Sequence, residues 1–293
     1  MSSPTRRAFL NGLAAVACPS LLAGQGQVRV GAHPWVYAAP RPNNDIYGIL
    51  DEIFAGMSYA GMAFIELMHT ALEPDDAVSR IGELSAAHQL PVIGASYGAG
   101  MWQRAEHTRI LEYAARLAER LEKLGGRLIG VSVGSARRPK TAEELDAQAA
   151  ILRRIIKLCE PRGIVINLHN HIYEVENNEH DLKGTLARIP DVKLGPDIDW
   201  LVGAKIDPVD FIRRHGGRIV YAHLRDRKPD GVWPEAMGEG AIDYAAVGRA
   251  LREIGFAGHL AIELAHPRDF RLTRPLRESL RMSRRYVREA MGY

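Results

Sequence analysis

Short apolar runs alternate with longer amphipathic stretches from Val28 to the end of the chain. Most of the short runs are continuous rather than alternating, which is typical of parallel strands covered on both faces. The pattern predicts eight strands, at residues 28–31, 62–67, 90–95, 127–133, 164–169, 192–197, 219–223 and 260–263.

The stretches between these runs carry helical patterns. One apolar face, at spacings of three and four residues, consists of Ile110, Ala114, Leu117, Leu121 and Leu124. Thr141 followed by Glu144 predicts a capping box that opens the next helix. Pro275 marks the start of the last helix, in which Leu276, Leu280, Ser283 and Val287 share a face.

Eight strand-helix units in series, without a linker-like break, predict one domain at residues 27–293, a single (β/α)8 TIM barrel in the α/β class. The length of 293 residues suits such a barrel. A two-domain, doubly wound protein is the alternative. No Gly-x-Gly-x-x-Gly follows the first strand, so a dinucleotide-binding fold has no direct support.

Residues 1–26 are interpreted as an export signal rather than as part of the fold. Arg6 and Arg7, followed by a weakly apolar run of small residues, resemble a bacterial twin-arginine signal, which predicts a periplasmic protein. Residues 15–17 offer a small-x-small cleavage site, and lipid anchoring at Cys18 is a weaker option. The run is too short to span a bilayer, so no stable membrane span is expected. A disordered basic N-terminus is the alternative.

Composition excludes several classes of protein. With 46% hydrophobic and 25% charged residues, the chain is neither collagen-like, disordered nor a polytopic membrane protein. Two cysteines exclude a disulfide framework and a Cys-only zinc module. Without Arg6 and Arg7, the formal net charge falls from +3 to +1, so no nucleic-acid partner is expected. The eight arginines between residues 268 and 288 are interpreted as the solvated face of the last helix.

The eleven histidines are more informative, because several stand with carboxylates at predicted strand ends. In a (β/α)8 barrel the carboxyl ends of the strands converge on one site. The polar and aromatic residues there are His33, Glu66, Tyr97, His169, His171, Asp197, His223 and Glu263. Two imidazoles and two carboxylates on neighbouring strands could hold a divalent metal ion, with Asn170 and Asp199 orienting the ligand histidines. A hydrogen bond from Asp199 to its own backbone is the alternative.

Three motifs in order resemble one protein family. His169-Asn170-His171 with Glu174 is similar to the HNHxxE motif of the xylose isomerase-like TIM barrel superfamily, in its sugar phosphate isomerase/epimerase branch. Residues 221–226 resemble its HLKD segment, and residues 237–243 its GEGxxD loop. The resemblance implies His169, Asp197, His223 and Glu263 as ligands of one divalent ion (Mn, Zn, Co or Mg). It also implies a small carbohydrate substrate, and a homo-oligomer is compatible with it.

The sequence departs from the family pattern at two positions. His169 stands where many ketose epimerases have a glutamate, which puts an epimerisation by two metal-bound glutamates in doubt. Arg225 stands where lysine is usual, and its fork suits bidentate contacts.

The resemblance implies an isomerase or epimerase of a sugar or keto-sugar that works through a metal-stabilised enediolate. The candidate bases are His171, Glu263 and Glu66, and His171 is the first choice because a free imidazole has a suitable pKa. The alternative role for His171 is to form a hydrogen bond to a metal ligand without acting as the base. Expulsion of a leaving group from the same intermediate would instead make the enzyme a keto-sugar lyase or dehydratase, for example in β-elimination of a 3-keto-glycoside.

The predicted substrate contacts combine polar groups with aromatic faces that stack on sugars, although packing at the barrel mouth is an alternative for the aromatic residues. They are His33, Trp35, Tyr97, Glu174, Trp200, Arg225 and Trp233. Two functions of other classes share the fold, an apurinic endonuclease and a non-catalytic sugar-binding barrel. The first needs more metal ligands and a basic DNA-facing surface, and the second needs no full metal set.

Overall fold

The computed structural model describes residues 28–267 and 269–293. The predicted export segment, with Arg6, Arg7 and Cys18, lies outside the described residues, as does Arg268. The structure therefore tests the predicted barrel fold but not the predicted export signal.

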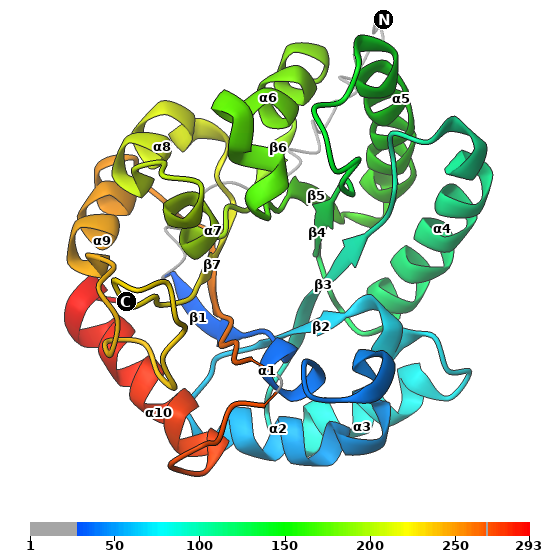
Figure 1. Cartoon of the computed structure of the whole chain (residues 1–293). Helices are drawn as coiled ribbons and strands as arrows, with labels where there is room; N and C mark the ends of the chain where they lie inside the picture. The colour runs from blue at the N-terminus through cyan, green and yellow to red at the C-terminus, as the bar shows by residue number, and fades with distance from the viewer. Residues whose placement is uncertain (1–27, 268) are drawn as a thin grey trace, which may run out of the picture.

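Eight parallel strands form one sheet in the order β6-β5-β4-β3-β2-β1-β8-β7. Isolated bridges from Leu194 to Ile219 and from Asp197 to His223 close it between β6 and β7. The single (β/α)8 barrel is thus confirmed, and Figure 1 shows the strands at the centre of a ring of helices. The strands are β1 (Arg29–Ala32), β2 (Ile65–Met68), β3 (Val92–Gly98), β4 (Leu128–Ser132), β5 (Val165–Leu168), β6 (Lys193–Leu194), β7 (Tyr221–Leu224) and β8 (His259–Ile262).

Strand β6 is shorter than the prediction of 192–197. Pro196 has no N–H to give to the ladder, so regular pairing ends at Leu194. The carbonyl of Pro196 still accepts a hydrogen bond of 2.9 Å from the N–H of His223. Asp197 is therefore held beside His223 although it lies outside the strand.

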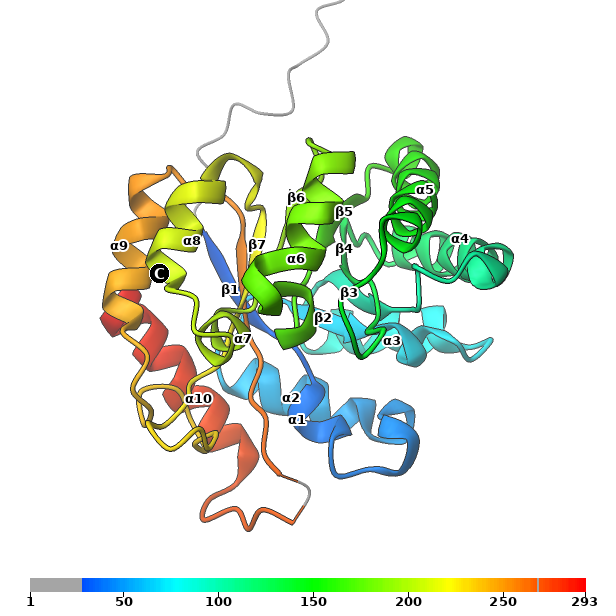
Figure 2. The same cartoon turned by 45° about the horizontal axis from the view of Figure 1, so that its top comes forward.

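The helices follow the strands around the outside of the barrel, as Figure 2 shows from the side. They are α1 (Trp35–Ala38), α2 (Leu50–Tyr59), α3 (Ala77–Ala87), α4 (His107–Lys123), α5 (Ala142–Cys159), α6 (Ile172–Arg188), α7 (Ile198–Gly203), α8 (Pro208–His215), α9 (Tyr244–Glu253) and α10 (Leu276–Tyr286). None of these described helices is long and apolar enough to cross a membrane.

Local sequence signals explain where several helices begin and what they bury. The predicted capping box is present, because Thr141 Oγ1 accepts from Glu144 N and Glu144 Oε2 accepts from Thr141 N. Helix α4 buries the predicted face with Ile110 and Leu117, and α10 buries Leu280 and Ser283. The core lies between these faces and the sheet.

Helix α6 is broken after its first turn. Asn177, Asn178 and Glu179 have φ values of 53°, 59° and 59°, in the left-handed region that asparagine tolerates better than most residues. The side chain of Glu179 is fixed there by Arg214, whose two terminal nitrogens donate to it at 3.0 and 3.2 Å. The break separates the turn that begins at Ile172 from the rest of the helix.

Asp226 ties together two of the sequence motifs. Its buried carboxylate accepts hydrogen bonds from the backbone N–H groups of Gly238, Gly240 and Ile242, at 2.8, 3.0 and 3.3 Å. A Cβ atom at Gly240 would stand 2.1 Å from Asp226 Oδ1, so glycine is required at this position. The end of β7 therefore fixes the path of the loop that leads to α9.

Candidate active site

A pocket of about 430 Å³ lies at the carboxyl ends of the strands. It is lined by ten of the predicted site residues: His33, Trp35, Tyr97, His169, His171, Trp200, His223, Arg225, Trp233 and Glu263. The lining thus combines imidazoles, indole rings, one guanidinium and one carboxylate.

Three of the four predicted metal ligands form a cluster. One ligand atom each from His169, Asp197 and His223 lies within 4.8 Å of the others. Asp197 is fully buried, and its Oδ1 accepts from the N–H of Trp200 at 3.1 Å, which caps α7. The side chain of Asn170 accepts from Asp197 N and donates to Asp197 O, so Asn170 fixes the backbone of Asp197 and not, as predicted, a ligand histidine.

His223 is oriented by a carboxylate behind it. Its Nε2 lies 2.5 Å from Glu66 Oε2, and the same oxygen accepts from the hydroxyl of Tyr221 at 2.9 Å. Histidine ligands of metals characteristically donate their second N–H to such a partner. Nδ1 of His223 is left to face His169 Nδ1 at 2.9 Å and Glu263 Oε2 at 3.1 Å.

Glu66, predicted as a candidate base, is accordingly placed beneath His223 and does not line the pocket. Burial alone would raise the pKa of Glu66, but the interactions with His223 outweigh it and lower the pKa. Burial alone would likewise lower the pKa of His223, which Glu66 and Glu263 instead raise to about 9. The two groups form a buried, strongly paired unit.

Glu263 lies next to the metal cluster with one oxygen unused. Oε1 is 3.1 Å from Arg225 Nη2, whereas Oε2 is buried without a hydrogen-bond partner among the described residues. Burial would raise the pKa of Glu263, but the guanidinium of Arg225 holds it well below its usual range. His169 has its pKa lowered by burial and by His223, so it is a neutral imidazole. An ionised carboxylate beside the imidazoles of His169 and His223 is a donor set that fits a divalent metal ion, provided that His223 gives up its second proton when the ion binds.

His171 lies between the barrel and the broken helix α6. Its Nδ1 is 3.2 Å from both Ser132 Oγ and the hydroxyl oxygen of Tyr173. These contacts leave Nε2 as the nitrogen available to a substrate. Burial would lower the pKa of His171, but the nearby carboxylate of Glu174 raises it.

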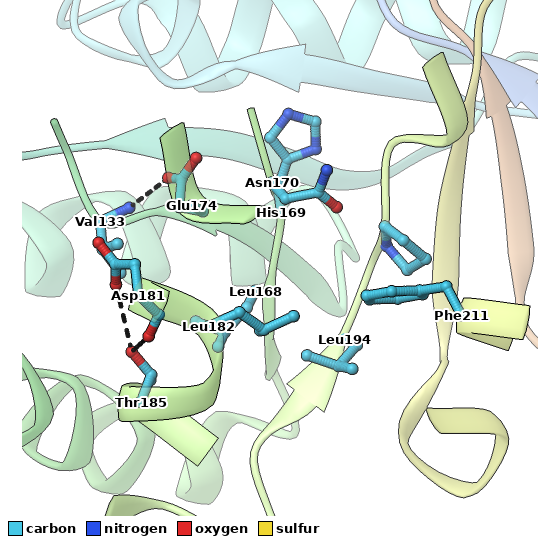
Figure 3. A pocket seen from close by; sticks show the side chains of 11 residues that line it. Val133, Leu168, His169, Asn170, Glu174, Asp181, Leu182, Thr185, Leu194 and Phe211 are labelled. Carbon is cyan, nitrogen blue, oxygen red and sulfur yellow. Dashed lines mark hydrogen bonds between the residues drawn. The ribbon is translucent and has the colours of Figure 1, made fainter. Parts of the chain in front are cut away.

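Glu174, predicted as a substrate contact, is not among the residues that line the pocket. Its oxygens accept from Ser132 Oγ at 2.6 Å, Val133 N at 3.2 Å and His171 N at 2.7 Å. It faces instead a small enclosed cavity of about 20 Å³, where Figure 3 shows its bond to the backbone of Val133. Glu174 therefore holds the turn that carries His171, because backbone and hydroxyl donors already occupy its carboxylate.

His33 is a neutral histidine whose two nitrogens both have partners. Its Nδ1 accepts from the backbone N–H of Trp35 at 3.2 Å, so the proton lies on Nε2, which is 2.9 Å from Ser96 Oγ. Burial lowers the pKa of His33. The geometry suits a wall residue that keeps Trp35 in place.

The two tryptophans at the pocket share a fixed arrangement. The rings of Trp200 and Trp233 meet edge to face at a centroid distance of 5.8 Å. Trp233 Nε1 donates to Asp199 Oδ2 at 3.0 Å, and Arg227 donates to both oxygens of Asp199. Asp199 thus anchors the Trp233 loop and does not cap its own backbone.

The lining residues that escaped the sequence reasoning include His69, Ser132 and His266. Ser132 ends β4, a strand for which no polar end residue had been assigned. His69 directly follows β2, one residue beyond Met68, and its Nδ1 lies 2.5 Å from the hydroxyl oxygen of Tyr113. Ser132 lies within the predicted strand 127–133, and His69 lies two residues beyond the predicted strand 62–67, so counting every polar residue near the two strand ends would have found both.

Comparison with solved structures finds the same fold in several epimerases. L-ribulose 3-epimerase is 22% identical, with a TM-score of 0.73, over 91% of this chain and 95% of that chain. D-allulose 3-epimerase from Methylomonas sp. is 17% identical, with a TM-score of 0.74, over 90% and 98%. The 3-keto-D-glucoside 4-epimerase from E. coli is 17% identical, with a TM-score of 0.71, over 90% and 100%.

A comparison with curated proteins found no matching relative. The family model described as xylose isomerase-like TIM barrel matches residues 54–286. That match takes in every strand from β2 to β8 and the predicted ligands at their ends. The chain therefore belongs to the xylose isomerase-like TIM barrel family.

Proposed function

We propose that the protein is a metal-dependent isomerase or epimerase of a sugar or keto-sugar. The observation that carries the proposal is the cluster of His169, Asp197 and His223 at a pocket that also presents Glu263 and indole rings. The epimerases with the same fold support the same reaction class.

Four residues would hold the ion: His169, Asp197, His223 and Glu263. A divalent ion bound there would polarise a sugar carbonyl and an adjacent hydroxyl, which acidifies the neighbouring carbon. Glu66 fixes the orientation of His223 from behind, and Asn170 fixes the backbone of Asp197. The ligands are thus held in place by the fold.

His171 is the residue placed to move the proton. It lines the pocket, and its Nδ1 is engaged by Ser132 and Tyr173, so Nε2 is free to take a proton from the carbon next to the carbonyl. Return of the proton by His171 to the neighbouring carbon gives an aldose–ketose isomer, whereas an epimer forms when a second donor, water or another group of the pocket, protonates the same carbon on its opposite face. Trp200 and Trp233 offer edges and faces against which a sugar ring can pack.

The test is incubation of the purified, manganese-loaded protein in deuterated water with D-fructose, D-allulose or a 3-keto-glucoside, followed by NMR. We expect deuterium at the carbon next to the carbonyl together with an epimer or isomer, and loss of both after chelation of the metal. Release of the aglycone would instead favour the keto-sugar lyase. No exchange and no metal binding would contradict the proposal and favour a non-catalytic sugar-binding barrel.

Export by the twin-arginine route, to the periplasm, remains a proposal that rests on the N-terminal sequence alone.

A further inference from the structure

Arg225 places a permanent positive charge within the candidate metal site. Its Nη2 lies 3.1 Å from Asp197 Oδ2 and 3.1 Å from Glu263 Oε1, so one nitrogen bridges two of the predicted ligands. The side chain is only 3% exposed, and a guanidinium does not lose its proton in proteins. The charge is therefore present whether or not a metal ion is bound.

The rest of the arginine is fixed as well. The rings of Trp200 and Trp233 lie 5.4 and 5.1 Å from its guanidinium carbon, within the range of cation–π attraction. The hydroxyl of Tyr244 accepts from Arg225 N and donates to Arg225 O, which holds the backbone at the end of β7. The guanidinium is thus part of the pocket wall, and rotation away from the carboxylates would sacrifice its contacts with both indole rings.

The bridge also determines which oxygen of Glu263 faces the histidines. Arg225 takes Oε1, and the unpartnered Oε2 lies 3.1 Å from Nδ1 of His223. The arginine therefore has two effects on a metal ion. It keeps the ligand oxygens in position, and it cancels part of the negative charge that would attract the ion.

We propose that Arg225 is a positioning residue that keeps Asp197 and Glu263 together and weakens the binding of a divalent metal ion. The inference rests on the proposed metal site and not on the sugar reaction. Of the two effects the charge dominates, since without Arg225 two buried carboxylates would face each other with no cation between them. Removal of the guanidinium should then make the protein bind a divalent ion more tightly.

The experiment is a calorimetric titration of the chelator-treated full chain with Mn²⁺, for the wild type and for R225M. We expect R225M to bind Mn²⁺ at least about tenfold more tightly, because a neighbouring positive charge has been removed from a buried site. R225K keeps the charge and should stay within about threefold of the wild type. R162M removes an arginine that pairs with Glu122 away from the pocket, and it controls for net charge.

Circular dichroism and thermal melting show whether each variant is folded, and R225Q replaces R225M if the latter does not fold. Equal or weaker Mn²⁺ binding by a folded R225M or R225Q would overturn the inference and leave the metal site intact. Tighter binding by R225K, matching that of R225M, would also overturn it, because charge would not be the cause. If the wild type binds no Mn²⁺, Co²⁺ or Zn²⁺, the proposed metal site and this inference fall together.

Discussion

The two halves of the barrel mouth differ in what their strands present to the pocket. Strands β5 to β8 and the residues that follow them carry His169, Asp197, His223 and Glu263, whose ligand atoms face one another. Strands β1 to β4 and their ends carry His33, His69, Ser96, Tyr97 and Ser132 at the pocket, and none of these five side chains is a carboxylate or a guanidinium. The first half can hold a cation, and the second can hold the hydroxyl groups of a ligand.

In the neutral half, formed by β1 to β4, hydrogen bonds show which nitrogen of His69 carries its proton. Tyr113 donates to Glu73 Oε1 at 2.7 Å, so its oxygen must accept from His69 Nδ1. Burial lowers the pKa of His69, which keeps the ring neutral. His69 therefore has a lone pair on Nε2, suited to accept a hydrogen bond from a substrate hydroxyl.

The largest loss of metal affinity is expected from a substitution in the half formed by β5 to β8, which carries the predicted ligands. H223A removes one imidazole ligand and leaves Glu66 buried without its main partner. We expect the affinity for Mn²⁺ to fall by more than about 100-fold. Loss of a group that only hydrogen-bonds to a ligand typically lowers metal affinity by about 10–100-fold, and loss of a ligand itself should cost more. Calorimetric titration measures it, and wild-type metal content in a folded H223A would refute the ligand assignment.

A smaller loss of metal affinity is expected at Glu66, which joins the two halves. Glu66 stands on β2, yet its carboxylate contacts His223 on β7. E66Q keeps the size of the side chain and loses its charge, so Mn²⁺ binding should weaken by about 10–100-fold. Unchanged metal affinity, together with a lost reaction rate, would instead make Glu66 a base, as the sequence alone had suggested.

The smallest effect is expected in the neutral half. H69A removes one acceptor for a substrate hydroxyl, so KM for the sugar turned over by the wild type should rise by about tenfold, with kcat and Mn²⁺ affinity little changed. Y113F removes only the group that orients His69 and should raise KM by about threefold. Steady-state kinetics separates these effects, and a fall in metal affinity in H69A would erase the distinction between the halves.

Much of the fold could be predicted from the sequence, because strand positions depend on apolar runs that are local in the chain. The largest departure was β6, where the predicted run extends to Asp197 but Pro196 ends regular pairing, and β3 also continues to Gly98, beyond the predicted 90–95. The motifs around His169 and His223 also placed candidate ligands at strand ends, and the structure brings ligand atoms of His169, Asp197 and His223 within 4.8 Å of one another.

The roles of Glu66 and Glu174 could not be predicted, because their partners come from other strands. Glu66 finds His223 and Tyr221 across the barrel, and Glu174 finds Ser132 on β4. Spacing along the chain predicts which side chains reach the mouth of the barrel. It does not predict which of them already form hydrogen bonds with residues from other strands. The bridge formed by Arg225 also depends on two other strands, β6 and β8, and has no local signal.

The three backbone bonds to Asp226 divide the loop between β7 and α9 into two parts. From Gly238 onward the chain is tied to the barrel, whereas residues 228–234 lie outside this attachment and include Trp233 at the pocket. An engineer could therefore exchange that short stretch to alter which ligands the pocket admits, while the anchored part preserves the frame beneath. Substrate range and barrel integrity are in this way separately adjustable within one connecting segment.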